Sequence, residues 1–140
     1  MATTTFTNTT DYGPADEIYS NITISGITVG DVTNMRFEID WTPDGDECGG
    51  DASSSSCNII DPDSSTSLQM FSYGSLNGGE ARTSISNKTS SFPSNFNGTW
   101  RFFLNDEDYT ECNQVTETRI IVTYTAAAAT TNAPFLMFVD

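Results

Sequence analysis

Residues 97–124 constrain the fold of this chain most strongly, because they read as a strand, an acidic loop and a second strand. From Trp100 to Leu104 every second residue is large and apolar, and a period of two places these side chains on one face of a β-strand. Residues 119–124 (RIIVTY) are β-branched and apolar, which favours a strand. Phe103 is apolar but lies on the opposite face, with Thr99 and Arg101. We therefore expect the first strand to be covered on both faces.

The composition also favours a single β-domain. The chain has 140 residues, with nine Phe, five Tyr and two Trp, which is enough aromatic volume for one sandwich core. Ser and Thr are abundant, whereas good helix formers such as Lys and Leu are scarce, and no stretch predicts a helix. The length predicts one domain.

Several other segments predict strands or turns. Residues 32–41 alternate apolar with charged side chains and give the clearest half-buried strand. Residues 21–29 are apolar with a phase shift at Ser25-Gly26, which predicts a bulge or a tight bend. Residues 68–73 predict a strand, and the polar residues 81–87 predict a strand near an edge.

We therefore predict an all-β, antiparallel β-sandwich, jelly-roll-like, of about eight strands. Residues 1–19 are expected to form an N-terminal arm or edge strand, and residues 20–125 the β-sandwich domain. Residues 126–140 are expected to be a linker and a hydrophobic C-terminal arm or last strand. Residues 42–66 predict a long loop, and loops of such length are usually functional or covalently stapled.

The charge of the chain limits its partners. With 19 acidic and 5 basic residues the formal net charge is −14, which opposes binding to nucleic-acid phosphates and to anionic lipid. The longest apolar run, PFLMFV, is too short to cross a membrane, so we expect no membrane insertion. Residues 1–10 lack a secretory signal; Met1 is either a natural start or an addition to a mature secreted domain.

The residues available for catalysis are few, so we expect no enzyme. The chain has no His, which excludes imidazole acid–base chemistry and a Ser-His-Asp triad. Lys88 is the single Lys and lies in a polar segment, where a solvated side chain is expected. The acidic residues cluster in loops without an apolar setting that would raise the pKa of one carboxyl group.

Two acidic loops predict a Ca²⁺ site, because carboxylate oxygens on flexible loops suit this ion. The candidate ligands are Asp44, Asp46 and Asp51 in the first loop and Asp106 and Asp108 in the second.

Residues 20–42 and 97–124 resemble the opening and closing halves of the P domain, the β-sandwich that follows the catalytic domain in proprotein convertases and some bacterial subtilisin-like proteases. The resemblance is carried by SNITISGITVGDVTNMRFEIDWT and by NGTW followed by an apolar strand, an Asp-containing loop and a strand ending in Tyr. Trp41-Thr42 stands where the family has His-Thr. The resemblance implies that the two acidic loops lie at the same end of the sandwich, where family members can hold Ca²⁺.

The chain has three cysteines, Cys48, Cys57 and Cys112, so at most one internal disulfide forms. We expect one disulfide, in oxidising surroundings. Pairing of Cys48 with Cys57 would staple the long loop. If the two acidic loops are neighbours, Cys112 pairs instead with Cys48 or with Cys57.

The C-terminal apolar run predicts an interface. It comprises Phe135, Leu136, Met137, Phe138 and Val139 and follows a small-residue linker. Burial of its five side chains is worth about 7–15 kcal/mol before entropy costs. Left in water it would be a sticky, β-prone end, so we expect it to dock, either as a last strand of its own sandwich or on a neighbouring subunit.

These features predict a non-catalytic structural or decorating subunit of a virion or surface appendage. Its partners would be copies of itself or other structural subunits, and its location a virion or extracellular surface assembly. The alternative is a P-domain-like accessory or carbohydrate-binding module of a secreted enzyme, in which exposed aromatics such as Tyr12, Tyr19, Tyr73 or Tyr109 stack on sugars.

Removal of Ca²⁺ by a chelator is expected to lower the thermal unfolding midpoint, because the acidic loops would then repel one another without a bound cation. Thermal melts of the purified chain with EDTA, with added Ca²⁺ and with added Mg²⁺ check this. An unchanged midpoint in all three would remove the Ca²⁺ site.

Overall fold

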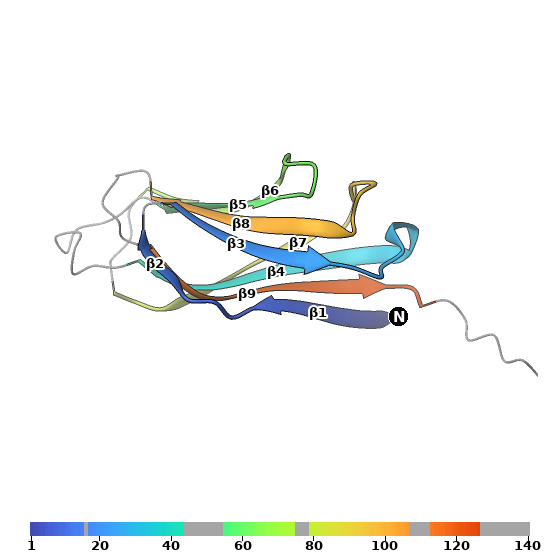
Figure 1. Ribbon diagram of the computed structural model, residues 1–140, viewed down its shortest axis with the longest axis horizontal. Coiled ribbons are helices and arrows are strands. Elements are labelled where there is room, and N and C mark those ends of the chain that lie inside the picture. Colours follow the sequence, from blue (N-terminus) through green and yellow to red (C-terminus); the bar gives the residue numbers. More distant parts are fainter. Residues whose placement is uncertain (16, 44–54, 75–78, 107–112, 127–140) are drawn as a thin grey trace, which may run out of the picture.

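The computed structural model describes residues 1–15, 17–43, 55–74, 79–106 and 113–126. In these ranges nine strands form two antiparallel sheets that face each other (Figure 1). The strands are β1 Ala2–Asn8, β2 Tyr12–Ala15, β3 Glu17–Ile24, β4 Val32–Pro43, β5 Ser55–Ile60, β6 Thr66–Tyr73, β7 Arg82–Lys88, β8 Gly98–Asp106 and β9 Asn113–Tyr124. A short 3-10 turn, η1, spans Val29–Asp31.

The strand order is that of a jelly roll. The first sheet has the order β1-β9-β4-β7, with β2 also paired to β9, and the second has the order β3-β8-β5-β6. Except for β1–β2 and β5–β6, consecutive strands lie in opposite sheets, as two Greek keys require. The predicted all-β, antiparallel sandwich is therefore confirmed, and the strand beyond the expected eight is the four-residue β2.

The core lies between the sheets and follows the alternation in the sequence. On β8, Trp100, Phe102 and Leu104 are buried. On β4 the buried set includes Phe37, whose ring lies 5.9 Å from that of Trp100 and 6.1 Å from that of Phe102, measured between centroids. Because β4 and β8 belong to different sheets, these aromatic contacts join the two layers.

Two hydrogen bonds satisfy buried polar side chains of this core. The indole Nε1 of Trp100 donates to the carbonyl of Phe96 at 2.9 Å, at the end of the sandwich where Phe92 and Phe96 pack edge to face. The hydroxyls of Ser20 and Thr118 share a hydrogen bond of 2.6 Å across the core. These bonds offset the cost of removing the polar groups from water.

The predicted long loop at residues 42–66 is wrong in its second half, because Ser55–Ile60 form β5, an inner strand between β6 and β8. The strand is difficult to recognise from sequence, since Ser and Asn carry little strand signal. Its inward-facing Cys57 and Ile59 are nevertheless fully buried, and burial of these side chains outweighs local propensity.

Two further strand boundaries differ from the sequence prediction. Residues 1–19, predicted as an N-terminal arm or edge strand, are divided between two sheets: residues 2–8 form the edge strand β1, and residues 17–19 begin β3, which is the edge strand of the second sheet. The apolar run at 21–29 bends after Ile24, where Gly26 has φ of 74°, a backbone conformation that glycine adopts without steric cost. The predicted tight bend is therefore present, and Ile27 lies beyond β3.

The expected cover on both faces of β8 is wrong for the described part of the chain. Phe103 is half-buried, and its ring stacks on that of Tyr19, with ring centroids 4.6 Å apart. No described element forms a layer over this face. Within the same ranges, no helix has the length and apolar character needed to cross a membrane.

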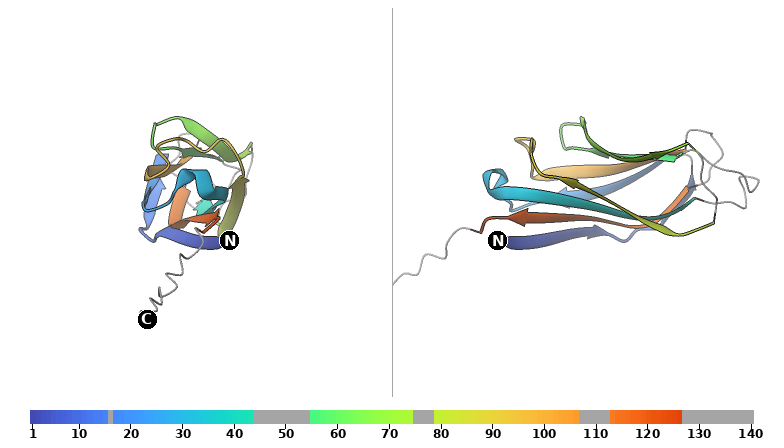
Figure 2. Two further views of the ribbon diagram at one scale, coloured as in Figure 1. Left: turned by 90° about the vertical axis from the view of Figure 1, so that its right-hand side faces the viewer. Right: turned by 180° about the vertical axis from the view of Figure 1, so that it is seen from behind.

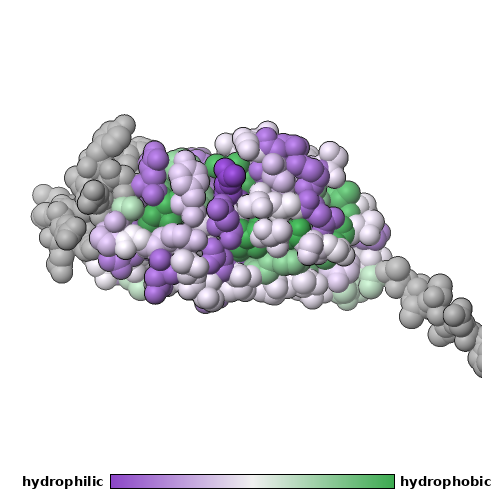
Figure 3. Space-filling model, viewed as in Figure 1, coloured by the Kyte–Doolittle hydropathy of each residue, from purple (hydrophilic) through white to green (hydrophobic). Residues whose placement is uncertain are grey.

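The view from one end, at the left of Figure 2, separates the two sheets and places β1 on the outside of the molecule. On the side seen in Figure 3, hydrophilic residues predominate and hydrophobic residues form small separate patches. The surface on this side is therefore mixed, and a binding site there would depend on local groups of residues.

Replacement of Phe102 by Ala is expected to lower the free energy of unfolding by about 3–5 kcal/mol, because it opens a cavity between the sheets. The matched change at the next residue, Phe103→Ala, is expected to cost about 1 kcal/mol, the value of one exposed aromatic contact. Urea unfolding followed by the fluorescence of the buried Trp residues checks both. Equal losses would contradict the assignment of the two side chains to opposite faces.

Candidate functional site

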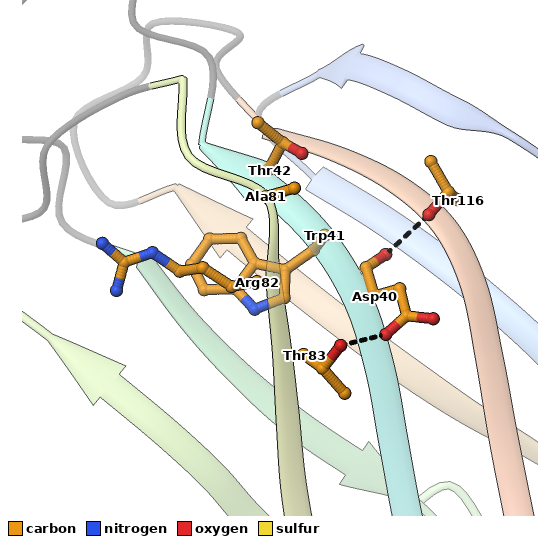
Figure 4. A pocket seen from close by; sticks show the side chains of 7 residues that line it. All are labelled: Asp40, Trp41, Thr42, Ala81, Arg82, Thr83 and Thr116. Carbon is orange, nitrogen blue, oxygen red and sulfur yellow. Dashed lines mark hydrogen bonds between the residues drawn. The ribbon is translucent and has the colours of Figure 1, made fainter.

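A shallow pocket of about 360 Å³ opens at one end of the first sheet, where β4, β7 and β9 lie side by side (Figure 4). Its walls are Asp40, Trp41, Thr42, Ala81, Arg82, Thr83 and Thr116. The buried Trp41 ring stacks on Phe71 at 4.8 Å and forms the floor. The guanidinium carbon of Arg82 lies 5.9 Å from the centre of the Tyr73 ring.

The charged groups of this pocket are one carboxylate and one guanidinium, and three threonines add hydroxyl groups. Asp40 accepts from Thr83 at 2.6 Å and from Arg119 at 2.8 Å. Burial raises the pKa of Asp40, but the hydrogen bonds from Arg119 and Thr83 outweigh it and hold the pKa below its usual value. Asp40 therefore stays ionised near neutral pH and does not serve as a proton donor there.

Arg82 contributes the guanidinium group of the pocket. Its Nε is buried and has no hydrogen-bond partner among the described residues, and a buried donor in that state favours an acceptor from outside the described fold. The pocket has the groups to bind a small polar molecule. Its one described hydroxyl–carboxylate pair is Thr83 with Asp40, and the lowered pKa of Asp40 makes this carboxylate a weak base.

An ion-pair network covers the outer face of the first sheet beside the pocket. Arg119 on β9 lies at its centre and contacts Glu38 at 2.6 Å, Glu117 at 2.7 Å and Asp40 at 2.8 Å. Glu38 also pairs with Arg36 at 2.6 Å, and its side chain is only 11% exposed. Two of these four ion pairs, Arg119 with Glu38 and with Asp40, join β9 to β4, and the network uses nearly all the charged side chains on this face.

The net pKa shift of Glu38 follows from this pairing. Burial raises the pKa of Glu38, but hydrogen bonds and charge attraction from Arg119 and Arg36 lower it by more than burial raises it. The pKa of Glu38 therefore lies below its ordinary value of 4.5. Glu38 is ionised at neutral pH, and its charge stabilises the fold.

A second candidate surface is the open edge of β1. This strand pairs with β9 through an unbroken register from Ala2 to Asn8, and no described strand pairs with its other side. Thr3, Thr5 and Thr7 are exposed on its outer face. Residues 1–10 carry no charged side chain. We call residues 2–7 the β1 edge.

The other three sheet edges carry features that hinder pairing with another chain. β3 begins with the exposed Glu17, and β7 carries Arg82 and Lys88. β6 is uncharged, but its pairing with β5 shifts register twice, and such bulges twist an edge away. The β1 edge is the described edge that is regular, neutral and open.

Most of the residues predicted as a site from sequence lie outside the described residues. They are Asp44, Asp46, Asp51, Asp108, Cys48, Cys112, Phe135, Leu136, Met137, Phe138 and Val139. Asp106 is the last residue of β8, where its backbone pairs with Ser55. No cluster of three or more potential metal ligands occurs among the described residues, so the Ca²⁺ site stays a prediction.

The described residues that flank the two acidic segments lie at one end of the sandwich. Pro43 pairs with Asn113 and Ser55 pairs with Asp106, and the Ser55 hydroxyl donates to the Asn113 side chain at 3.2 Å. The two segments, 44–54 and 107–112, therefore start and finish close together. The acidic loops themselves lie outside the described residues, so the placement that the P-domain resemblance implies for them stays a prediction.

Cys57 has a free thiol that is fully buried between the sheets. Burial raises the pKa of this thiol well above its usual range. Its sulfur lies 3.8 Å from that of Met70. Because Cys57 is enclosed in the core, the geometry favours the pairing of Cys48 with Cys112 among the predicted alternatives, and the disulfide itself stays a prediction.

The ion-pair network was not predicted from sequence, although its signal is present. Arg36, Glu38 and Asp40 occupy alternate positions of one strand, and Glu117 and Arg119 do so on another. The sequence gives the outward direction of these side chains. It does not give the strand pairing of Glu38 with Arg119, which brings the opposite charges together.

Replacement of Glu38 by Gln is expected to lower the free energy of unfolding by about 1–2 kcal/mol at neutral pH. Since the pKa of Glu38 is lowered in the folded state, its stabilisation is present above the unfolded pKa and is lost as the pH falls through the folded pKa. The variant and the parent should therefore converge in acid. Urea unfolding from about pH 7 to about pH 3 measures this.

The matched control is Glu17→Gln, at an exposed carboxylate without an ion pair among the described residues, which should follow the parent at every pH. A constant difference between Glu38→Gln and the parent over the whole range would contradict the charge-based role of Glu38.

Comparisons with known proteins give structural similarity only. No family model matches the chain, and no curated protein matches it in sequence, so the P-domain resemblance stays a prediction. The fold is similar to a solved structure described as a xylan-binding module CBM15, with TM-score 0.49 and 11% identity over 87% of this chain and 92% of that one.

It is also similar to part of a structure of infectious bursal disease virus Gx strain, with TM-score 0.45 and 9% identity over 91% of this chain and 33% of that chain. This chain thus spans about a third of the viral chain. TM-scores and identities this low assign no function.

Proposed function

We propose that this chain is a non-catalytic structural subunit of a virion or surface appendage, and that the β1 edge joins it to a second copy of itself. The observation that carries the proposal is the open, regular and uncharged edge of β1. A strand with unpaired backbone groups and no protective charge is a ready template for another strand.

The charge of the chain supports the choice of this surface. Two copies with a formal net charge of −14 each repel one another over most of their surfaces. Residues 1–10 carry no charged side chain, so repulsion is weakest where two β1 edges meet. Antiparallel pairing of the two edges would join the first sheets of both copies into one sheet around a two-fold axis.

The residues described so far support a role without catalysis. The chain has no His, and the pocket carboxylate Asp40 is committed to Arg119 and Thr83. Jelly rolls are common in capsid proteins and in lectins. The proposed location, a virion or extracellular surface assembly, rests on this analogy between folds together with the geometry of the β1 edge. We propose neither nucleic acid nor a membrane as a partner.

The proposal includes the C-terminal run, residues 135–139, as a second contact to neighbouring subunits, and Ca²⁺ at the acidic end as a stabilising ion. The run follows β9, whose last residue, Tyr124, pairs with Ala2 at the start of β1. The C-terminal segment thus leaves the described fold beside the β1 edge.

Thr5→Asp is expected to weaken self-association by about tenfold or more, because it places like charges opposite one another at the centre of the joined edges. The control is Asn87→Asp, which adds the same charge to an exposed position on β7, the other edge of the same sheet. Light scattering after size exclusion, over a range of concentrations, gives the mass of each variant.

A parent chain that is monomeric at every concentration would overturn the proposal, as would equal weakening by Thr5→Asp and Asn87→Asp. Circular dichroism confirms that each variant is folded. A chain truncated after Ala133 separates the contribution of the C-terminal run from that of the β1 edge.

A further inference from the structure

The outer face of the second sheet carries an exposed aromatic pair. Tyr19 on β3 and Phe103 on β8 are direct partners in the strand register. Their rings are stacked, with centroids 4.6 Å apart and an interplanar angle of 15°. Tyr19 remains 44% exposed, and β3 is the edge strand of its sheet. One face of the Tyr19 ring is covered by Phe103, so the other is available to a ligand.

Planar polar side chains surround this pair. Asn58 on β5 is the register partner of Phe103 on the side away from Tyr19. Asn21 and Arg101 are partners in the neighbouring row of the same face, and Asn105 lies on the row beyond the pair. Rows on one face are about 7 Å apart along the strands, and adjacent strands are about 4.8 Å apart. The group therefore covers an area suited to a short chain of rings.

The polar side chains of this group are not used within the fold. None of Asn21, Asn58, Arg101 and Asn105 has a side-chain hydrogen bond or ion pair to another described residue. The charged face of the first sheet differs, because its Arg and carboxylate side chains bind one another. The strands of the second sheet thus place these donors and acceptors on one face, where they can bind an external partner.

The chemistry of the group favours a sugar. The C–H face of a pyranose ring packs on an aromatic ring, and its neighbouring hydroxyls match the paired donors and acceptors of amide and guanidinium groups. The aromatic part of the group is a single pair, which is small for the centre of a stable protein–protein interface. Nucleic-acid bases also stack on aromatic rings, but a net charge of −14 repels their phosphates.

We propose that the outer face of the β3-β8-β5-β6 sheet binds a neutral polysaccharide, with one pyranose ring stacked on Tyr19. Asn21, beside Tyr19 on β3, binds hydroxyl groups of the stacked sugar, whereas Arg101 and Asn105 on β8 and Asn58 on β5 bind those of neighbouring sugars that cross the sheet. The ligand is neutral because the overall charge of the chain disfavours acidic glycans. The site lies on the sheet opposite the ion-pair network and does not involve the β1 edge.

Native gel electrophoresis in gels that contain neutral soluble polysaccharides tests the site. The probes are a β-1,4-glucan, xylan, mannan and soluble starch, each in a separate gel. We expect retardation of the parent chain by at least one of them. Tyr19→Ala should weaken binding about tenfold, the value of one lost aromatic stack. Tyr19→Phe, which keeps the ring, should retain most of the binding.

The matched control is Ile85→Ala, because Ile85 is 47% exposed on the outer face of the opposite sheet. It should bind as the parent does. Asn58→Ala is expected to weaken binding without loss of the aromatic pair. Thermal melts show whether each variant is folded. No retardation of the parent by any of the four polysaccharides would overturn the proposal, and so would equal binding by the folded Tyr19→Ala and Ile85→Ala variants.

The gel assay is repeated with the Thr5→Asp variant, which tests the sugar site apart from self-association. Binding by a monomeric Thr5→Asp chain supports the sugar site whatever the outcome at the β1 edge. Loss of binding in that variant, with a normal melt, would overturn the independence of the two surfaces.

Discussion

The fold depends on aromatic packing between the two sheets, at the place where Phe37 on β4 meets Trp100 and Phe102 on β8. All three side chains are buried, and each belongs to a strand that lies inside its sheet. This contact fixes which face of β4 and of β8 points inward. Since side chains alternate along a strand, the inward choice also decides what the outer faces display.

The two outer faces that result have different chemistry. On the first sheet, Arg119 forms ion pairs with Glu38, Asp40 and Glu117, so these charged groups bind one another. On the second sheet, the stacked pair Tyr19 and Phe103 lies among polar side chains that bind nothing else described. Ion pairs on its outer face thus stabilise the first sheet, whereas we propose that the outer face of the second sheet binds a ligand. The β1 edge adds a third surface, suited to strand pairing.

Local sequence predicted much of this fold, but not all of it. The strict alternation over residues 32–41 gave β4, and the turn at Gly26 was expected from the phase shift beside it. β5 is not predicted from sequence because Ser55, Ser56 and Asn58 are polar residues typical of loops, although Cys57 and Ile59 of the same strand are buried in the core. Phe103 predicts a second covering layer, whereas in the structure its ring stacks on Tyr19, which comes from a distant part of the chain.

By itself, the sequence determined the class of structure and the faces of its strands, because both follow from a period of two and from residue composition. It also determined the net negative charge and the absence of imidazole. Only the tertiary structure decided which strands became neighbours. The pairs of Arg119 with Glu38 and of Tyr19 with Phe103 join residues far apart in the chain. Such contacts depend on packing of the whole core, which no local pattern contains.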